Sequence, residues 1–537
     1  MLVQLKNYSR RDYLVFILVC VLLIIGFLLR YLQLEEYPLT VNQDELSNIY
    51  DGYSIARTGA DRWGEKYPVI LRAFGNMDYR PPMYAWLCAI PIELFGYSIY
   101  SGRLVSVVLG FVSLLLIYLV GEKMGGRLFG LLALLLATFS PWHIVFSRVA
   151  SEGTMLPPFF LICSCYLWQK AQEKGYSLAS LAWLGLSIGL GTNTYQAGKL
   201  TFFLFTLLVL IDLWRYASRF FQKALVLGIS ALVGAGPQLI AAVTMPDRFL
   251  SRADGSMMEF SWSFQYFNTL FKNIALNLSP DFLFFNFGVG NYFTVARLLM
   301  IECLFFYLGM FLIHKVVSKN QAIKPAYIYA LLFMAVLPSA LTRENPHALR
   351  ASGLTVLLPL LSAAGIVLVY KHINNAVLRN AFVAVTVGLA LWNAKYFLQE
   401  YTASDTLIKE TMPALTAKGI ERLNNYKDWY DTVVLDKTGD GSQMYLYVAS
   451  YCGMTPEEFQ RAEKRYDAYG WDEFKQLGKY HFLNQSELDE LLQKTESKVL
   501  IMTRTRHTNY TAVDSVELPG EKMYIYSSGP AQLLSKN

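Results

Sequence analysis

Apolar runs of about 20 residues recur through the first three quarters of the sequence, and a run of this length is what crosses a bilayer as a helix. The first is LVFILVCVLLIIGFLL, from Leu14 to Leu29. Hydrophobic residues make up 54% of the chain and charged residues only 16%. The sequence therefore predicts an all-α polytopic membrane protein with about eleven transmembrane helices. The other predicted spans cover about 100–121, 128–146, 154–169, 178–194, 200–214, 225–244, 297–314, 326–342, 353–370 and 381–397.

The first run follows a basic N-terminus, as the apolar core of a cleavable signal peptide also does. Lys6, Arg10 and Arg11 precede it, and Arg30 and Glu35 follow it without a small-x-small cleavage site. We therefore expect the first span to be retained in the protein.

Basic residues in the connections between spans predict the orientation. If the N-terminus is cytoplasmic, every cytoplasmic connection carries two or three basic residues, whereas the short outer segment GTNTYQAGK carries only Lys199. An odd number of spans then puts the C-terminus outside. The formal net charge of +6 follows from these connections, so it does not indicate a nucleic-acid partner. The cytoplasmic basic residues are Lys123, Arg127, Lys170, Lys174, Arg215, Arg219, Lys223, Lys315, Lys319, Lys324, Lys371 and Arg379.

The outer face receives the longest polar segments, at about 31–99, about 245–296 and from about 400 to the end. The last segment alternates strand-like runs (TVVLDKT, KVLIMTRT, KMYIYSS) with amphipathic helix-like runs. We therefore predict a transmembrane domain at 1–399 and a small extracytoplasmic α/β domain at 400–537.

An acidic pair, Asp44 and Glu45, follows the first span by about ten residues. An acidic residue in hydrocarbon costs on the order of 3 kcal/mol, so the pair is expected outside the membrane near its surface. One interpretation is a solvated helix start, with Asp44 as the N-cap of ELSNIYDGYSIAR. The other is an acidic site that acts on a substrate held at the interface.

The pattern of the whole first loop favours the second interpretation. The acidic pair is followed by an amphipathic helix, by TGADRWGEKYPV, by NMDYRPPMYAWLCAIPIELFG and by SGRLVSVVLG at the start of the second span. This loop resembles that of the GT-C fold glycosyltransferases that use polyprenol-phosphate sugars, in particular the protein mannosyltransferase and aminoarabinose transferase branch (glycosyltransferase family 39-like). The resemblance covers about 1–400 and is strongest between Asp44 and Arg103. SPWHIVFSRVASEG, GTNTYQAGK and ENPHALRASG also resemble outer segments of that family.

The resemblance implies an activity. Members move a sugar from a polyprenyl-phosphate carrier to an acceptor on the outer side of the membrane, usually with inversion at the anomeric carbon. It implies Asp44 as the general base for the acceptor hydroxyl and Glu45 as a residue that orients the acceptor or the base. The implied partners are a polyprenyl-phosphate-linked sugar donor, the lipid bilayer, and an acceptor that is a protein, a glycolipid or a wall polymer.

Arg80 is the first candidate for the donor phosphate, because a guanidinium can bind phosphate oxygens bidentately. Family members often place a basic residue directly before this proline, here Pro81. Some relatives carry an acid just before that basic residue, whereas this chain has Tyr79 there and Asp78 one step earlier. Arg80 as an interfacial anchor is the alternative.

The segment TRENPHALR supplies a second basic group, formed by Arg343, His347 and Arg350. Their spacings of three and four would bring them together on a helical turn, where they could bind phosphate or sugar. A capped outer turn with interfacial charges is the alternative, and Glu344 lies among them.

Besides Asp78 and Tyr79, four further residues are candidates for the substrate cavity. Arg148 and Glu152 are four apart, so they could pair with each other or contact the substrate. Tyr195 and Lys199 resemble cavity-lining residues of the family, and an ordinary polar turn is the alternative.

No cofactor is indicated with certainty. The acidic pair is compatible with binding a divalent cation, magnesium or manganese, as well as with a base. H-E-x-x-H, P-loop and dinucleotide-binding motifs are missing from the sequence.

Two other functions fit a chain of this kind. A transporter or flippase for lipid-linked sugars would place ionisable residues mid-membrane on broken helices. A non-catalytic scaffold for cell-envelope assembly would tolerate loss of Asp44. The style of the loops favours a bacterial plasma membrane, and the endoplasmic reticulum is the alternative address.

Overall fold

The structure is a computed structural model, which describes residues 10–39, 41–285, 297–317, 323–403, 411–437, 443–463, 465–467, 470–495, 497–518 and 520–529. The chain forms two compact units. The helical unit contains the residues up to Leu34, Pro81–Tyr84 and Arg103–Tyr401. The mixed unit contains Glu35–Arg80, Ala85–Gly102 and the residues from Thr402 onward.

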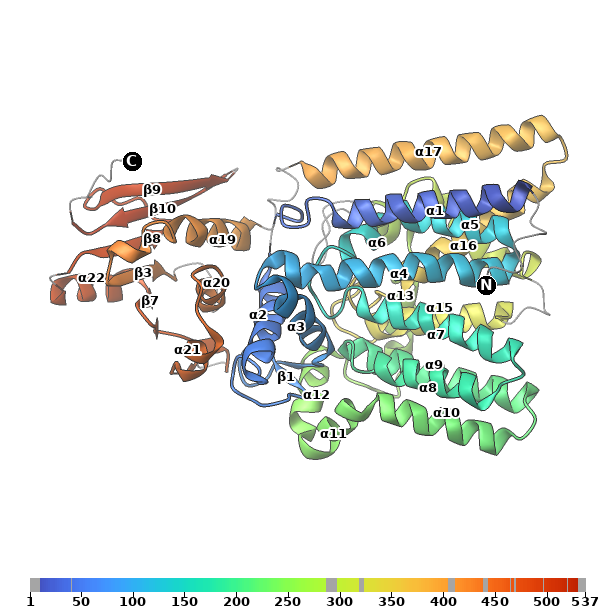
Figure 1. Ribbon diagram of the computed structural model, residues 1–537, viewed down its shortest axis with the longest axis horizontal. Coiled ribbons are helices and arrows are strands. Elements are labelled where there is room, and N and C mark those ends of the chain that lie inside the picture. The colour runs from blue at the N-terminus through green and yellow to red at the C-terminus, as the bar shows by residue number, and fades with distance from the viewer. Residues whose placement is uncertain are drawn as a thin grey trace. The chain divides into compact units, whose positions relative to one another are not determined.

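In the helical unit, the axes of the longer helices run in a similar direction (Figure 1). Each of the eleven predicted spans coincides with one helix or with two consecutive ones. These helices are α1 (Arg10–Tyr31), α4 (Ile99–Gly125), α5 (Arg127–Phe139) with α6 (Pro141–Phe146), α7 (Leu156–Glu173), α8 (Leu178–Gly191), α9 (Gln196–Tyr216), α10 (Phe220–Gly234) with α11 (Gly236–Thr244), α14 (Glu302–Leu312), α15 (Pro325–Ala340), α16 (Leu354–His372) and α17 (Ala376–Thr402).

Five of the described helices are long and apolar enough to cross a membrane: α1, α4, α9, α16 and α17. A sixth span results if α10 and α11 count as one, although they are bent by 69° at their junction. Shorter apolar helices include α5, α8 and α15. The chain is thus a multi-pass membrane protein, and the total of eleven spans stays a prediction.

The predicted outer segment at 245–296 contains two more helices, α12 (Pro246–Ser256) and α13 (Phe264–Asn277), and a π-helical turn at Asp281–Phe285. Residues 286–296 of this segment lie outside the described residues.

Small residues allow neighbouring helices of the helical unit to approach closely. A Cβ atom at Gly365 of α16 would lie 2.0 Å from the carbonyl oxygen of Phe305 on α14, and one at Gly309 would lie 1.8 Å from that of Leu361. Without a hydrophobic driving force between helices in lipid, such close backbone contact is a main source of helix association. Gly365 and Gly309 thus determine the packing of α14 against α16.

A buried carboxylate joins three helices of the helical unit. Asp212 on α9 accepts hydrogen bonds of 2.7–2.8 Å from four side chains of α7, α15 and the turn after α7. Because these hydrogen bonds join α9 to α7 and α15, Asp212 is a structural cross-link. The donors are Trp168, Gln172, Tyr176 and Tyr327.

The mixed unit contains a six-stranded sheet with the strand order β6-β7-β3-β8-β10-β9. The central strand β3 runs parallel to β7 and β8, whereas β10 runs antiparallel to β8 and β9. The predicted strand-like runs coincide with β3, β8 and β10. The strands are β3 (Thr432–Asp436), β6 (Gln476–Leu477), β7 (Tyr480–Leu483), β8 (Val499–Thr503), β9 (Thr511–Leu518) and β10 (Glu521–Ser527).

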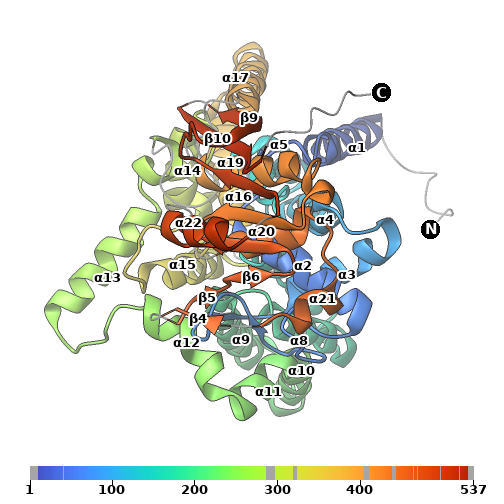
Figure 2. The same cartoon turned by 90° about the vertical axis from the view of Figure 1, so that its left-hand side faces the viewer.

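Four helices accompany this sheet, and Figure 2 shows their positions within the mixed unit. Two shorter strand pairs also belong to the unit, β1 (Leu71–Arg72) with β2 (Tyr79–Arg80) and β4 (Arg465–Tyr466) with β5 (Asp472–Glu473). The helices are α19 (Thr411–Leu423), α20 (Met444–Tyr451), α21 (Pro456–Arg461) and α22 (Gln485–Lys494).

The first loop and the C-terminal segment share one hydrophobic core in the mixed unit. The loop contributes Val41, Leu46, Tyr50 and Phe74, which pack with residues of α19, α20, α21 and the sheet. Leu46 and Tyr50 belong to α2 (Gln43–Thr58), whose buried face is therefore covered by residues about 400 positions later in the chain.

Candidate functional site

The acidic pair lies in the first turn of α2. Asn42 is the N-cap, and its side-chain oxygen accepts a hydrogen bond of 2.9 Å from the Glu45 backbone NH. Asp44 is half-buried and Glu45 is buried. Acidic residues are common in the first turn of a helix, because the helix dipole is favourable there. The structure thus places the pair at a capped helix start, with Asn42 and not Asp44 as the cap.

Asp51, two turns after Asp44 on α2, is a buried carboxylate that the sequence analysis missed. Its Oδ2 accepts hydrogen bonds from Arg62 at 2.5 Å and from Arg80 at 3.4 Å. Ser47, one turn earlier, accepts a 2.6 Å hydrogen bond from Arg80. The sequence holds one signal for this network. Ser47 and Asp51 are four residues apart, which puts both on one face of the helix.

This network is buried, which affects its electrostatics. Arg62 and Arg80 are fully buried, and Arg62 also donates to the carbonyl oxygens of Ser47 and Ala73. Burial raises the pKa of Asp51, and the positive charges of Arg62 and Arg80 oppose that rise. A buried ion is tolerated only when it is paired and hydrogen-bonded. The network therefore fixes Arg80 to α2.

Asp78, Tyr79 and Arg80 are all buried on the β1–β2 hairpin. Tyr79 pairs with Arg72 and Arg80 with Leu71 in the register of the hairpin, and the Ala73 NH donates to the Asp78 carbonyl at 2.8 Å. In the described structure, Arg80 is consequently held by its hairpin and by Asp51.

The predicted basic group of the helical unit is only partly brought together. Residues 341–353 form bends and turns and no helix, so the expected helical turn at Arg343–Arg350 is wrong. The Glu344 carboxylate lies 3.6 Å from His347 and 3.5 Å from Arg350. Arg343 instead lies 3.5 Å from Glu259.

The path of this segment has a physical cause in its hydrogen bonds to distant residues. The Asn345 side chain accepts from Asn277 at 2.5 Å and donates to the Asn273 carbonyl at 3.2 Å. The backbone NH of His347 donates to Ser339 at 3.0 Å. These tertiary bonds replace the helical hydrogen bonds that the sequence spacing assumed.

Arg148 contacts the end of α1. Its guanidinium donates to the carbonyl oxygens of Leu29 at 2.9 Å and Gln33 at 2.8 Å. Arg103 likewise donates to the Leu34 carbonyl at 2.7 Å. Helix C-termini carry unsatisfied carbonyls and a partial negative charge, so these arginines stabilise the end of α1.

The Tyr195 ring lies against Gly153, the residue after Glu152, in the helical unit. Glu152 itself is buried. Lys199, one turn into α9, places its ammonium 3.6 Å from the centre of the Phe249 ring and 3.4 Å from the Phe249 carbonyl oxygen. Tyr195 and Lys199 therefore lie at the N-terminal end of α9, and Lys199 is directed to α12.

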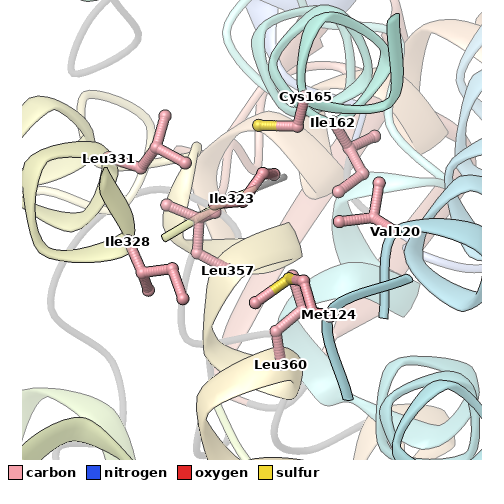
Figure 3. A pocket seen from close by; sticks show the side chains of 9 residues that line it. All are labelled: Val120, Met124, Ile162, Cys165, Ile323, Ile328, Leu331, Leu357 and Leu360. Atoms are coloured by element: carbon pink, nitrogen blue, oxygen red, sulfur yellow. The ribbon is translucent and has the colours of Figure 1, made fainter. Parts of the chain in front are cut away.

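The part of the chain that the structure describes adds no further chemistry at a metal-binding group or in its apolar pocket. Among the described residues, no group of three or more His, Cys, Asp or Glu side chains could hold a metal ion, so we derive no step through a cation. Figure 3 shows a pocket of the helical unit whose lining is entirely apolar. It offers no group for acid–base chemistry. The lining residues are Val120, Met124, Ile162, Cys165, Ile323, Ile328, Leu331, Leu357 and Leu360.

Comparisons with known proteins show which fold this is. Residues 79–244 match the family model described as dolichyl-phosphate-mannose-protein mannosyltransferase. The chain is also similar to the crystal structure of ArnT from Cupriavidus metallidurans bound to undecaprenyl phosphate, with a TM-score of 0.57 and 13% identity over 97% of this chain and 99% of ArnT. The protein has the GT-C glycosyltransferase fold.

Two further structures agree with this GT-C fold. ArnT in the apo state matches with a TM-score of 0.55 and 14% identity over 97% of this chain and 99% of that one. The archaeal oligosaccharyltransferase AglB from Archaeoglobus fulgidus, in complex with an inhibitory peptide and a dolichol-phosphate, matches with a TM-score of 0.50 and 11% identity over 98% of this chain and 75% of AglB. A comparison with the curated proteins finds no match.

Proposed function

We propose that this GT-C protein is an inverting glycosyltransferase that moves a monosaccharide from a polyprenyl-phosphate carrier to an acceptor at the outer face of the membrane. The observation that carries the proposal is a GT-C fold over nearly the whole chain, combined with a carboxylate pair in the first turn of α2. ArnT in the related structure is bound to undecaprenyl phosphate, a lipid phosphate of the class we propose as the carrier.

Asp44 is the proposed general base. It removes the proton of the acceptor hydroxyl while that oxygen attacks the anomeric carbon of the donor. The bond between the anomeric carbon and the phosphate oxygen breaks, and its electron pair leaves with the polyprenyl phosphate. A single displacement inverts the anomeric configuration. Glu45 is proposed to orient the acceptor or Asp44.

The leaving phosphate needs positive charge. His347 and Arg350 are proposed ligands, because they already hold one anionic group, the Glu344 carboxylate, which is itself exposed. Arg343 is proposed as a third ligand. Arg80 could join only if its guanidinium left Asp51 and Ser47.

Six further residues are proposed to line the substrate cavity, and their conformations support the proposal to different degrees. Glu152 and Tyr195 are supported by the position of the Tyr195 ring against Gly153, next to Glu152. Arg148 donates to the carbonyls of Leu29 and Gln33, so its contact with the substrate is proposed from the resemblance alone. Lys199 is proposed from the resemblance alone, and Asp78 and Tyr79 are proposed because they directly precede Arg80, although the chain departs from the family pattern there.

The proposed membrane is the plasma membrane, with the N-terminus cytoplasmic and the acidic pair outside. The donor's lipid chain explains why one sugar transfer employs so many helices, because each buried methylene contributes about 0.8 kcal/mol to binding. The endoplasmic reticulum stays the alternative location.

The test is mass spectrometry of cell-envelope glycans and glycoproteins. Cells would carry the intact gene, a deletion, Asp44→Asn, or the control Asp428→Asn, whose carboxylate is exposed on the mixed unit and lies 3.8 Å from Lys479. We expect the deletion and Asp44→Asn to lose the same single sugar, since a positioned base contributes about 10²–10⁴ to the rate. Asp428→Asn should keep that sugar.

Two results would contradict the proposal. If Asp44→Asn restores everything that the deletion loses, Asp44 is only part of a helix start. If purified protein moves a lipid-linked sugar across vesicles without transferring it, the chain is a flippase.

A further inference from the structure

The C-terminal segment of the mixed unit hydrogen-bonds to both ends of α2. The Tyr447 hydroxyl on α20 donates to the Val41 carbonyl at 3.0 Å, directly before the N-cap Asn42. At the other end, the Gln460 side chain on α21 donates to the hydroxyls of Ser54 at 3.0 Å and Thr58 at 3.1 Å. Two short helices of the C-terminal segment thus bind one helix of the first loop.

A further hydrogen bond and the shared core bind the middle of α2. The Tyr50 hydroxyl donates to the Met454 carbonyl at 3.0 Å, and the Tyr50 ring lies 5.4 Å from the ring of Phe459. Leu46, two residues after Asp44, is fully buried in the shared core. The buried side of α2 is consequently formed with residues from α20 and α21.

Arg62 and Arg80 hold the middle of α2 through Asp51 and Ser47, whereas the partners from the C-terminal segment also reach its two ends. The helix has 16 residues, just above the length of about 12–15 below which isolated helices are marginal in water, and most helical stability in proteins comes from tertiary packing. A reacting group also needs a position defined to about 0.5 Å, and an error of about 1 Å can cost on the order of 10² in rate. Whatever holds the first turn of α2 therefore determines where Asp44 lies.

We infer that the C-terminal segment is a positioning element for the proposed base, and that Tyr447 is its decisive positioning residue. This inference rests on the proposed function, because it assumes that Asp44 acts in transfer. Tyr447 touches the chain three residues before Asp44 and contributes no reacting atom. Gln460 and Met454 hold the rest of α2 in the same way.

The decisive variant is Tyr447→Phe, which removes one hydroxyl and leaves the buried ring. Its control is Tyr426→Phe, which removes a hydroxyl that donates to Asp514 at 2.9 Å elsewhere in the mixed unit. Both variants would be purified in detergent, and kcat and KM for a polyprenyl-phosphate sugar would be measured with the acceptor found by the envelope analysis.

Tyr447→Phe should lower kcat about 2- to 12-fold, the equivalent of one hydrogen bond, with KM for the donor within about twofold of the intact protein. Tyr426→Phe should leave kcat unchanged. Amide hydrogen exchange gives an independent readout, because residues 41–48 should exchange faster in Tyr447→Phe and not in Tyr426→Phe. A residue with a merely structural role would change both kinetic constants or neither.

The outcomes separate this inference from the proposed function. If the intact protein is active and Tyr447→Phe has normal kcat and normal exchange at 41–48, the inference is wrong. Equal losses in Tyr447→Phe and Tyr426→Phe also overturn it, since they would report only the stability of the unit. If Asp44→Asn is fully active while Tyr447→Phe still speeds exchange at 41–48, the proposed base is wrong and the attachment of α2 stands.

Discussion

At the scale of single residues, one carboxylate of the first loop has an unusual environment. Asp61 is buried there. Its Oδ1 accepts hydrogen bonds of 2.9 Å from the backbone NH groups of Trp63 and Glu65, and only 1% of the residue is exposed. Burial, followed by the negative charge of Asp51, raises the pKa of Asp61 to about 7. The ordinary pKa of an aspartate is about 3.9, so folding stabilises the protonated form of Asp61.

This shift predicts a pH dependence of stability. A raised carboxyl pKa means that the folded state binds the proton more tightly, so the destabilisation grows as pH rises from about 4 to about 7. Asp61→Asn keeps the accepting oxygen and cannot ionise. We expect it to stabilise the protein at pH 8, by up to about 4 kcal/mol, and to be nearly neutral at pH 4. Thermal unfolding of the purified protein at both pH values measures the difference.

Asp472→Asn is a suitable comparison for Asp61→Asn, because Asp472 is equally buried but forms an ion pair with Arg72. It should destabilise the protein at pH 8. A pH-independent effect of Asp61→Asn would contradict the raised pKa.

Asn42 allows a test at the scale of one element, because it caps the helix that carries the acidic pair. Asn42→Ala removes the acceptor for the Glu45 NH and should cost about 1 kcal/mol of helix stability. The first turn of α2 would then fray, so sugar transfer should fall together with the melting temperature. Asn484 caps α22 by the same hydrogen bond, at 3.0 Å to Glu487.

Asn484→Ala should therefore lower the melting temperature by a similar amount and leave transfer unchanged. If Asn42→Ala and Asn484→Ala transfer sugar at equal rates, order at the start of α2 does not matter for activity.

The membrane helices were predictable from sequence because their cause is local. A helix in lipid must satisfy its backbone within one apolar segment of about 20 residues, so the run at 353–370 locates α16 (Leu354–His372) within two residues. The strand-like runs of the C-terminal segment were also readable, since alternation and β-branched residues are local signals.

The site was predictable only where local rules act. The acidic pair could be placed at a helix start, but Asp51 was missed because a mid-helix acid usually lies on a solvated face. Its partners Arg62 and Arg80 reach it from 11 and 29 residues away. The prediction of a helical turn at Arg343–Arg350 was wrong because the Asn345 side chain hydrogen-bonds to Asn277, which lies 68 residues earlier in the chain.

At the scale of the whole molecule, the linear order of the chain does not match its packing units. Composition changes near residue 400, yet Leu46, Tyr50 and Phe74 of the first loop share a core with the C-terminal segment. No local pattern could show this, since the hydrogen bond from Tyr447 to Val41 spans 406 residues.

This arrangement predicts the effect of truncation after residue 403. The loop at 35–80 would lose its core partners, and trypsin should then cut it at Arg62 and Arg72, which are buried or nearly so in the full chain. Limited proteolysis with mass spectrometry measures the cleavage rates. Cleavage in the predicted cytoplasmic connection at Arg215 and Arg219 serves as the control and should be equal in both chains. Equal resistance of the 35–80 loop in both chains would contradict the shared core.

The shared core also has a consequence in time. Roughly 320 residues separate Arg80 from Thr402, so at synthesis rates of about 5–20 residues per second the loop waits on the order of 15–60 s for its partner. During that interval Leu46, Tyr50 and Phe74 have no core to enter. A cell making this protein must therefore keep an unfinished, apolar loop from aggregating while most of the membrane part is still being made.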